Sequence, residues 1–262
     1  TQSFVDRFTA LGTARANESI EVTARTTSVV TRINFREGQR VRTGDALVEL
    51  DSKQESADLG LAEAQLKQAE NQYQRSKTLA VSQAVSAADL DQLEANVLVA
   101  RAQVQGARAR LDRLSIRAPF AGTVGLRKVS LGDLVGPDTV ITTLDDTSVI
   151  KLEFGIPENF VSDLKAGMTI VADSTVYAGR RFEGTVTSID SRVDAVTRAV
   201  TVLATVPNGD GLLKPGMFLT VGLEKKRDQV LMIPEEALVP REGRQYVFVV
   251  QDGKAMEREV TL

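Results

Sequence analysis

Two stretches of this 262-residue chain repeat each other without a gap. Residues 24–51 (ARTTSVVTRINFREGQRVRTGDALVELD) align with residues 118–145 (APFAGTVGLRKVSLGDLVGPDTVITTLD) at a constant offset of 94 positions. The identities are Ala24/Ala118, Val30/Val124, Gly38/Gly132, Val41/Val135, Leu50/Leu144 and Asp51/Asp145, with Leu47/Ile141 as a near match. Both copies have the composition of short strands and turns. Because such units cannot each bury a face alone, we expect them to pack together as two halves of one β domain.

The segment between the halves, residues 52–114, predicts an inserted helical hairpin. It contains no Pro, and its apolar and small residues recur at alternating spacings of three and four, which is typical of a coiled-coil seam. The seam positions are Leu59, Ala62, Leu66, Ala69, Tyr73, Ser76 and Ala80, and then Leu90, Leu93, Val97, Ala100, Val104, Ala107, Leu111 and Leu114. A connection at 81–85 is short enough to make the arms antiparallel. Arms of about 28 residues would extend about 42 Å, so we expect the hairpin to project.

The predicted tip of the hairpin, from Arg75 to Ser86, reads RSKTLAVSQAVS. Ser52–Glu55 and Ser86–Asp89 resemble capping boxes, which makes Ser86 the expected N-cap of the second helix. Leu79 falls beside the seam, and Arg75 lies one turn earlier on the same stripe. A lone exposed Leu is common, and a cation near a helix C-terminus is favourable in itself. At a projecting tip, a contact between this pair and a partner helix is the more specific hypothesis.

Composition argues against most chemistry. The chain has no Cys and no His, which excludes thiol nucleophiles, His bases and the usual zinc sites, and its four Met residues are scattered. A net charge of −3 with mixed signs argues against nucleic acid as a partner. Possible carboxylate pairs are Asp145/Asp146 and Asp190/Asp194, but Asp is common in turns and at strand ends, and no combination of nucleophile and base accompanies them. We therefore expect no enzymatic activity, no cofactor and no metal.

A set of motifs gives the chain a family resemblance. They are IRAPFAGTV (Ile116–Val124) and GDLV (Gly132–Val135), then IPE (Ile156–Glu158), VDAVTR (Val193–Arg198) and LKPGM (Leu213–Met217), and finally IPEEAL (Ile233–Leu238) and YVFV (Tyr246–Val249). The paired halves resemble a biotinyl/lipoyl domain. With the inserted hairpin and the strand-rich remainder, the chain resembles the periplasmic adaptor (membrane fusion protein, HlyD-like) family of tripartite efflux pumps. It is most similar to adaptors of resistance-nodulation-division (RND) pumps that have a short hairpin.

The resemblance implies a mainly β, elongated and modular protein. It divides the chain into a lipoyl-like β-sandwich (20–51 and 115–146), an α-helical coiled-coil hairpin (52–114), a β-barrel (147–224) and an incomplete membrane-proximal β domain (1–19 and 225–262). Residues 9–19 have the barrel as their alternative assignment.

The resemblance also implies a role. The protein would link an inner-membrane transporter, most similar to the RND type, to a TolC-like outer-membrane channel, with six copies in the assembled pump. It would lie in the periplasm, attached to the inner membrane by an N-terminal lipid or helix outside this sequence. Adaptors that meet such channels share the pattern R-x3-L-x6-S at the tip, which Arg75, Leu79 and Ser86 match. The alternatives are an adaptor of an ABC exporter or type I secretion system and, more remotely, a lipoyl or biotin carrier.

Overall fold

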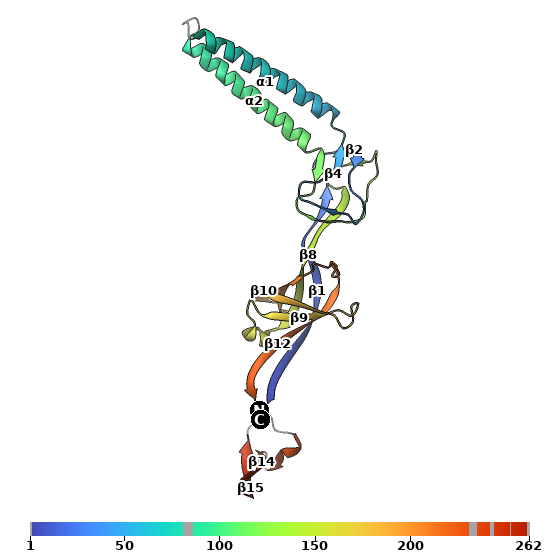
Figure 1. The fold of residues 1–262 in the computed structure, drawn as a ribbon, viewed down its shortest axis with the longest axis vertical. Helices are drawn as coiled ribbons and strands as arrows, with labels where there is room; N and C mark the ends of the chain where they lie inside the picture. Colours follow the sequence, from blue (N-terminus) through green and yellow to red (C-terminus); the bar gives the residue numbers. More distant parts are fainter. Residues whose placement is uncertain (1, 81–85, 231–234, 242–243, 252, 261–262) are drawn as a thin grey trace. The chain divides into compact units, whose positions relative to one another are not determined.

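The computed structural model describes residues 2–80, 86–230, 235–241, 244–251 and 253–260 (Figure 1). The chain is mainly β with one pair of α-helices, which confirms the predicted fold class. It divides into two compact units, which are taken separately below. One comprises Thr1–Thr13, Leu152–Thr205 and Phe218–Leu262, and the other comprises Ala14–Lys151 and Val206–Met217. The finer division into four modules stays a prediction.

The first unit is built on long antiparallel strands. The strands that pair in order are β1 (Gln2–Thr23), β12 (Phe218–Val230), β9 (Thr169–Asp173), β10 (Arg181–Val193), β11 (Ala199–Pro207) and β8 (Val140–Pro157). A further pairing joins β1 to β8, so the six strands close into a ring. A short 3-10 helix, η1 (Glu158–Asp163), follows β8. A closed sheet has no free edge strand, which removes a common route to aggregation.

The interior of this ring follows from alternation along the strands. Every second residue is buried along β11 and along the first half of β10, among them Phe182, Val186, Val200 and Val202. Alternate side chains point to one face of a strand, so this pattern fills the interior with apolar groups. Gly12 lies where a Cβ would come within 3.0 Å of a Leu152 side-chain atom, so a larger residue would force the packing apart.

A small three-stranded antiparallel sheet lies toward the C-terminal end of the described chain. It consists of β13 (Val239–Arg241), β14 (Arg244–Gln251) and β15 (Lys254–Val260), preceded by the 3-10 helix η2 (Glu235–Ala237). Val247 is its buried residue, whereas Phe248 and Val250 are exposed.

The second unit contains the repeat. Its short strands are β2 (Ser28–Ile33), β3 (Arg40–Val41), β4 (Ala46–Leu50), β5 (Ser115–Arg117), β6 (Gly122–Val124) and β7 (Leu134–Val135). One apolar core draws on both halves, and five repeat-related pairs all lie in it. They are Ala24/Ala118, Val30/Val124, Val41/Val135, Leu47/Ile141 and Leu50/Leu144. The prediction that the halves pack into one core is therefore confirmed.

Hydrogen bonds in this unit repeat at the same offset. The Gly38 amide donates to the Val124 carbonyl at 3.0 Å, and the equivalent Gly132 amide donates to the Val30 carbonyl at 2.9 Å. The strands also exchange partners, because β2 of the first half pairs with β7 of the second and β3 pairs with β6. Gly38 and Gly132 have φ angles of 71° and 89°, so both turns use the conformation that favours glycine. The halves are thus interlocked.

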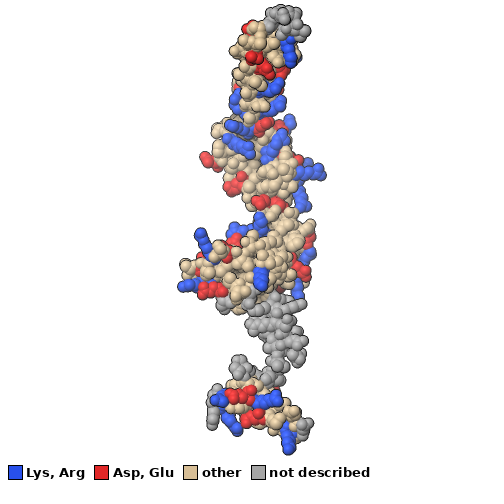
Figure 2. All heavy atoms as spheres, turned by 90° about the vertical axis from the view of Figure 1, so that its left-hand side faces the viewer, with Lys and Arg blue, Asp and Glu red and all other residues tan. Residues whose placement is uncertain are grey.

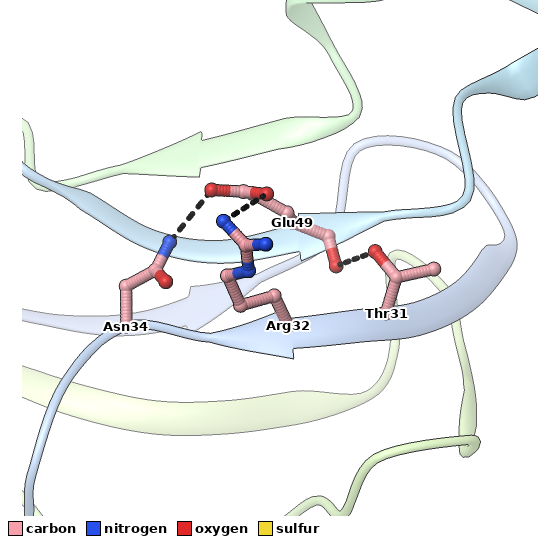
Figure 3. A network of polar contacts seen from close by, with 4 residues as sticks. All are labelled: Thr31, Arg32, Asn34 and Glu49. Carbon is pink, nitrogen blue, oxygen red and sulfur yellow. Dashed lines mark hydrogen bonds and ion pairs between the residues drawn. The ribbon is translucent and has the colours of Figure 1, made fainter.

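Glu49 on β4 holds the outer face of the first half (Figure 3). Its carboxylate accepts from Asn34 Nδ2 at 2.8 Å and lies 3.8 Å from Arg32 Nη1. Its backbone carbonyl accepts from Thr31 Oγ1 at 3.0 Å. These contacts tie β2 to β4 at the point where the β2–β4 register shifts, between Val30 and Arg32.

Candidate functional site

The two helices form the predicted coiled coil. α1 (Lys53–Ala80) and α2 (Ala87–Asp112) lie side by side and antiparallel (Figure 1). Within α2 every side chain off the predicted seam is exposed, whereas the seam residues are buried or half-buried. Val97, Ala100 and Ala107 are the most buried of them. The spacing of three and four therefore identified the contact line correctly.

One flank of the seam is crossed by ion pairs. Arg108 Nη2 lies 3.5 Å from Glu63 Oε1, and Arg101 Nη2 lies 3.2 Å from Glu70 Oε1. The two pairs fix the register, because a step of seven residues forward on α1 matches a step of seven backward on α2. All four side chains are about half exposed, so each pair contributes only about 0.5 kcal/mol.

The opposite flank, which we call the amide face, is uncharged along most of its length. Its side chains continue the three-four spacing beside the seam: Leu61, Gln65, Gln68 and Gln72 on α1, and Gln92, Asn96, Val99, Gln103 and Gly106 on α2. Two shallow grooves, of about 630 and 400 Å³, lie along it and share Gln65, Val99 and Gln103. The two flanks of one hairpin therefore differ sharply in charge.

The structure places Arg75 and Leu79 at the tip end of this same stripe. Both side chains are exposed, and Leu79 keeps 53% of its surface accessible. The stripe runs from Asp58 through the glutamines to Arg75 and then Leu79 without a break in spacing. The predicted connection at 81–85 lies outside the described residues.

Ser86 is the N-cap of α2, as predicted. Its hydroxyl accepts from the Asp89 backbone N–H at 3.1 Å and donates to Asp89 Oδ2 at 2.6 Å. At the start of α1, Ser52 holds the N-cap position, because its backbone carbonyl accepts from the Ser56 N–H at 2.9 Å. The side-chain bond to the first turn differs from the prediction, because Asp51 Oδ1 accepts from the Lys53 N–H at 3.3 Å in place of a Ser52 hydroxyl. Asp51 directly precedes Ser52, and its longer side chain reaches the first turn.

Sequence reasoning missed the amide face. The signal was present, since Gln65, Gln68 and Gln72 follow the spacing of the seam one position before it. Polar residues at helical spacing are normally read as a solvated face. Only the difference from the ion-paired flank makes the stripe conspicuous.

The candidate carboxylate pairs serve local structure. The Asn17 side-chain amide, which donates to Asp146 Oδ2 at 2.8 Å, is the main cause that lowers the pKa of Asp146. The backbone N–H of Thr197, which donates to Asp194 Oδ1 at 2.8 Å, is the main cause that lowers the pKa of Asp194. A general acid at neutral pH needs a raised pKa, so the geometry gives these carboxyls no acid role.

The described residues contain no group of three or more acidic side chains arranged to hold a metal ion. Basic and acidic side chains are interspersed over the face shown in Figure 2. Lys53, the first Lys after the first half, opens α1 and therefore does not stand on a tight turn between strands as a carrier lysine would.

Comparison with known proteins assigns the family. Residues 18–146 match the model of the CzcB-like barrel-sandwich hybrid domain, and residues 151–227 match the model of the CusB-like β-barrel domain. The first match spans both repeated halves and the hairpin inserted between them. The chain belongs to the periplasmic adaptor, or membrane fusion protein, family.

Individual relatives agree with this assignment. The adaptor is 33% identical over 230 residues to an uncharacterised protein of Haemophilus influenzae, covering 87% of this chain and 60% of that one. It is 29% identical over 275 residues to the multidrug resistance protein MdtA of Escherichia coli, covering 96% and 66%. A crystal structure of a MacA-MexA chimera that carries the Pseudomonas aeruginosa MexA α-hairpin superposes with a TM-score of 0.75 at 26% identity, covering 84% and 82%.

The adaptor chain spans less than two thirds of the length of the first two relatives. Within the described residues, neither helix combines the length and the apolar character that a membrane crossing requires.

Proposed function

We propose that this adaptor links an inner-membrane RND-type transporter to a TolC-like outer-membrane channel in a tripartite efflux pump that exports drugs or other small molecules. The observation that carries the proposal is the helical hairpin inserted between two interlocked halves, in a chain that matches adaptor domains before, through and after that insertion. The related MdtA is named a multidrug resistance protein, which supports the drug-export role. The role is mechanical, and no bond is made or broken by the chain.

The tip of the hairpin is the proposed contact with the channel. Arg75 and Leu79 lie one turn apart on one stripe, and both are exposed. An exposed cation and an apolar side chain at this spacing suit a helix end that presents a carboxylate or carbonyl beside an apolar pocket. Ser86 starts the return helix, and its hydroxyl already exchanges two hydrogen bonds with Asp89. We therefore assign Arg75 and Leu79 as the contact pair and Ser86 chiefly as the cap.

The remaining parts of the proposal concern assembly. Six copies surround the channel axis, with the lipoyl-like modules (20–51 and 115–146) side by side and the barrel (147–224) and membrane-proximal modules (1–19 and 225–262) nearer the transporter. The protein lies in the periplasm, held to the inner membrane by an N-terminal lipid or helix. The two family matches, which end at 146 and begin at 151, support the boundary between the lipoyl-like and barrel modules.

The tip assignment is tested by Arg75→Glu and Leu79→Asp in cells that depend on the pump. Both side chains are exposed, so each substitution changes the stability of the fold by less than about 0.5 kcal/mol. We expect drug susceptibility to rise to the level of a strain that lacks the adaptor. Circular dichroism and protein abundance in the same cells verify that the variants fold.

Two substitutions serve as matched controls. Leu98→Asp places the same charge at a Leu that is 58% exposed on the other side of the hairpin, and Lys67→Glu reverses an exposed charge in the middle of α1. Both controls are expected to keep efflux. Normal efflux by folded Arg75→Glu and Leu79→Asp variants would refute the docking role.

A further inference from the structure

A groove of about 510 Å³ lies at the base of the hairpin, wholly within the second unit. One wall is the end of β1, residues 20–23, together with Arg25. The other wall comes from residues 112–119, which include the end of α2 and all of β5. β5 is the edge strand of its four-stranded sheet, and no strand pairing joins it to β1 in the described part of the chain. The sandwich is therefore open here, and the opening has the size of a small-molecule site.

The two walls are equivalent segments of the repeat. At the offset of 94 residues, 20–23 (IEVT) align with 114–117 (LSIR), so the repeat begins four residues before its first identity at Ala24. The apolar members of both segments lie in the shared core or pack against it, and they are Ile20, Val22, Leu114 and Ile116. The groove thus lies where the two halves meet. Ile20, Val22 and Ile116 give it an apolar lining.

Three exposed arginines line the same groove, namely Arg25, Arg113 and Arg117. Among the described residues, none of the three forms an ion pair with a carboxylate. Arg117 Nη1 donates to the Gly44 carbonyl at 3.0 Å, which holds the guanidinium in place and uses only one of its five N–H groups. The groove therefore combines apolar walls with cations that the chain itself does not neutralise by pairing.

The repeat shows that the fold does not require these cations. Arg25 is equivalent to Pro119, and Arg117 is equivalent to Thr23, so each half has an uncharged residue where the other has an arginine. The apolar positions, in contrast, are apolar in both halves. Two acidic residues, Glu21 and Asp112, also line the groove, which leaves three cations against two carboxylates.

We propose that this groove binds a dissolved anionic amphiphile, a small molecule with a carboxylate or sulfonate head and an apolar body. A guanidinium group matches the two oxygens of such a head with parallel hydrogen bonds. The apolar body lies against Ile20, Val22 and Ile116, where it is removed from water. A concave site admits a single molecule, whereas the surface of a membrane cannot enter it. The binding does not depend on the proposed role in efflux.

Isothermal titration calorimetry on the full chain tests the ligand class, with decanoate below its micelle concentration as the probe. We expect one decanoate to bind each chain. Decyltrimethylammonium and decyl maltoside have the same apolar chain with a cationic and an uncharged head, and both are expected to bind at least about tenfold more weakly. Octanoate, which is shorter by two methylene groups, is also expected to bind roughly tenfold more weakly.

Charge variants test the site by the sign of their effect. Arg25→Gln and Arg113→Gln each remove a cation and are expected to weaken decanoate binding roughly fivefold, whereas Glu21→Gln removes a carboxylate and is expected to strengthen it roughly twofold. Arg36→Gln is the matched control, because Arg36 is an exposed arginine of the first half that does not line the groove. This control is expected to keep the affinity. All four side chains are exposed, so the variants are expected to fold, which circular dichroism verifies.

Hydrogen exchange locates the bound probe. We expect decanoate to slow exchange at residues 20–23 and 115–117 and to leave the amide face unchanged. Equal binding of all three ten-carbon probes would overturn the proposal, because it would show apolar binding without charge recognition. Protection of the amide face instead of the groove, equal effects of Arg25→Gln and Arg36→Gln, or binding to phosphatidylglycerol vesicles without binding of dissolved decanoate would also overturn it.

Discussion

Two glycines of the repeat allow a sharp test of the interlocked halves. Gly38 and Gly132 have φ angles of 71° and 89°, and a Cβ built on either meets no atom within 4 Å. Substitution by Ala therefore changes only the backbone energy. The left-handed conformation is unfavourable by about 1–2 kcal/mol for a residue with a Cβ. Ala also has fewer backbone conformations than Gly in the unfolded chain, which stabilises the folded state by about 0.4–1 kcal/mol. A net destabilisation of about 1 kcal/mol therefore remains.

Hydrogen exchange on the full chain measures the effect where it arises. The amides of Val30 and Val124 donate across the two halves, each at 2.9 Å, and report the opening of the shared core. A loss of about 1 kcal/mol accelerates their exchange roughly fivefold. Because the halves exchange strands, Gly38→Ala is expected to accelerate both amides, and Gly132→Ala is expected to do the same.

Gly60→Ala is the matched control, because the position is equally open but lies inside α1. There the same substitution gains about 0.8–1 kcal/mol of helix propensity, so the neighbouring α1 amides are expected to exchange roughly fourfold more slowly. The account would fail if Gly132→Ala slowed exchange in the core, or if Gly38→Ala accelerated only the amides of its own half.

Three further predictions concern single contacts. Ser86→Ala removes the cap of α2, so we expect a loss of about 1 kcal/mol in helix stability and roughly fivefold faster hydrogen exchange of the Asp89 amide. Ser86→Asp retains a capping oxygen and is expected to keep the exchange rate. Equal exchange rates in the two variants would contradict the role of Ser86 as the cap. Leu144 is fully buried, so Leu144→Ala opens a cavity and is expected to destabilise the second unit by about 2–5 kcal/mol. The measurement is a urea titration monitored by hydrogen exchange of core amides. A loss of stability below about 1 kcal/mol would show a poorly packed core. The lowered pKa of Asp194 means that its hydrogen bonds stabilise the folded turn above the unfolded pKa of about 3.9 and weaken as the pH falls through the lower folded pKa. After correction for intrinsic rates, the Thr197 amide should therefore exchange faster at acidic pH in the natural chain but show no such dependence in Asp194→Ala.

Much of the second unit could be predicted from sequence because its signals are local or periodic. The offset of 94 residues located the core pairs, and the spacing of three and four located the seam. The paired Gly38 and Gly132 of the repeat both lie at positive φ, a conformation that strongly favours one residue type. These features depend on patterning, which a single sequence displays directly.

Other features depend on the register between segments, which sequence alone did not supply. The contrast between the ion-paired flank and the amide face appears only when Glu70 is known to meet Arg101. The exchange of strands between the halves, with β2 on β7 and β3 on β6, was also outside the reach of the repeat alignment. The side-chain acceptor at the start of α1 was expected from Ser52 but comes from Asp51, because both residues are good capping types and only geometry separates them.

The central claim is that the exposed pair at the tip touches the outer-membrane channel, and site-specific photo-cross-linking in intact cells tests it most directly. A photoreactive residue at position 79 is compared with the same residue at position 98, which is similarly exposed on the hairpin. The account predicts a cross-linked species that contains the channel from position 79 and none from position 98. A channel adduct from position 98 alone, or none from position 79 while efflux continues, would contradict it.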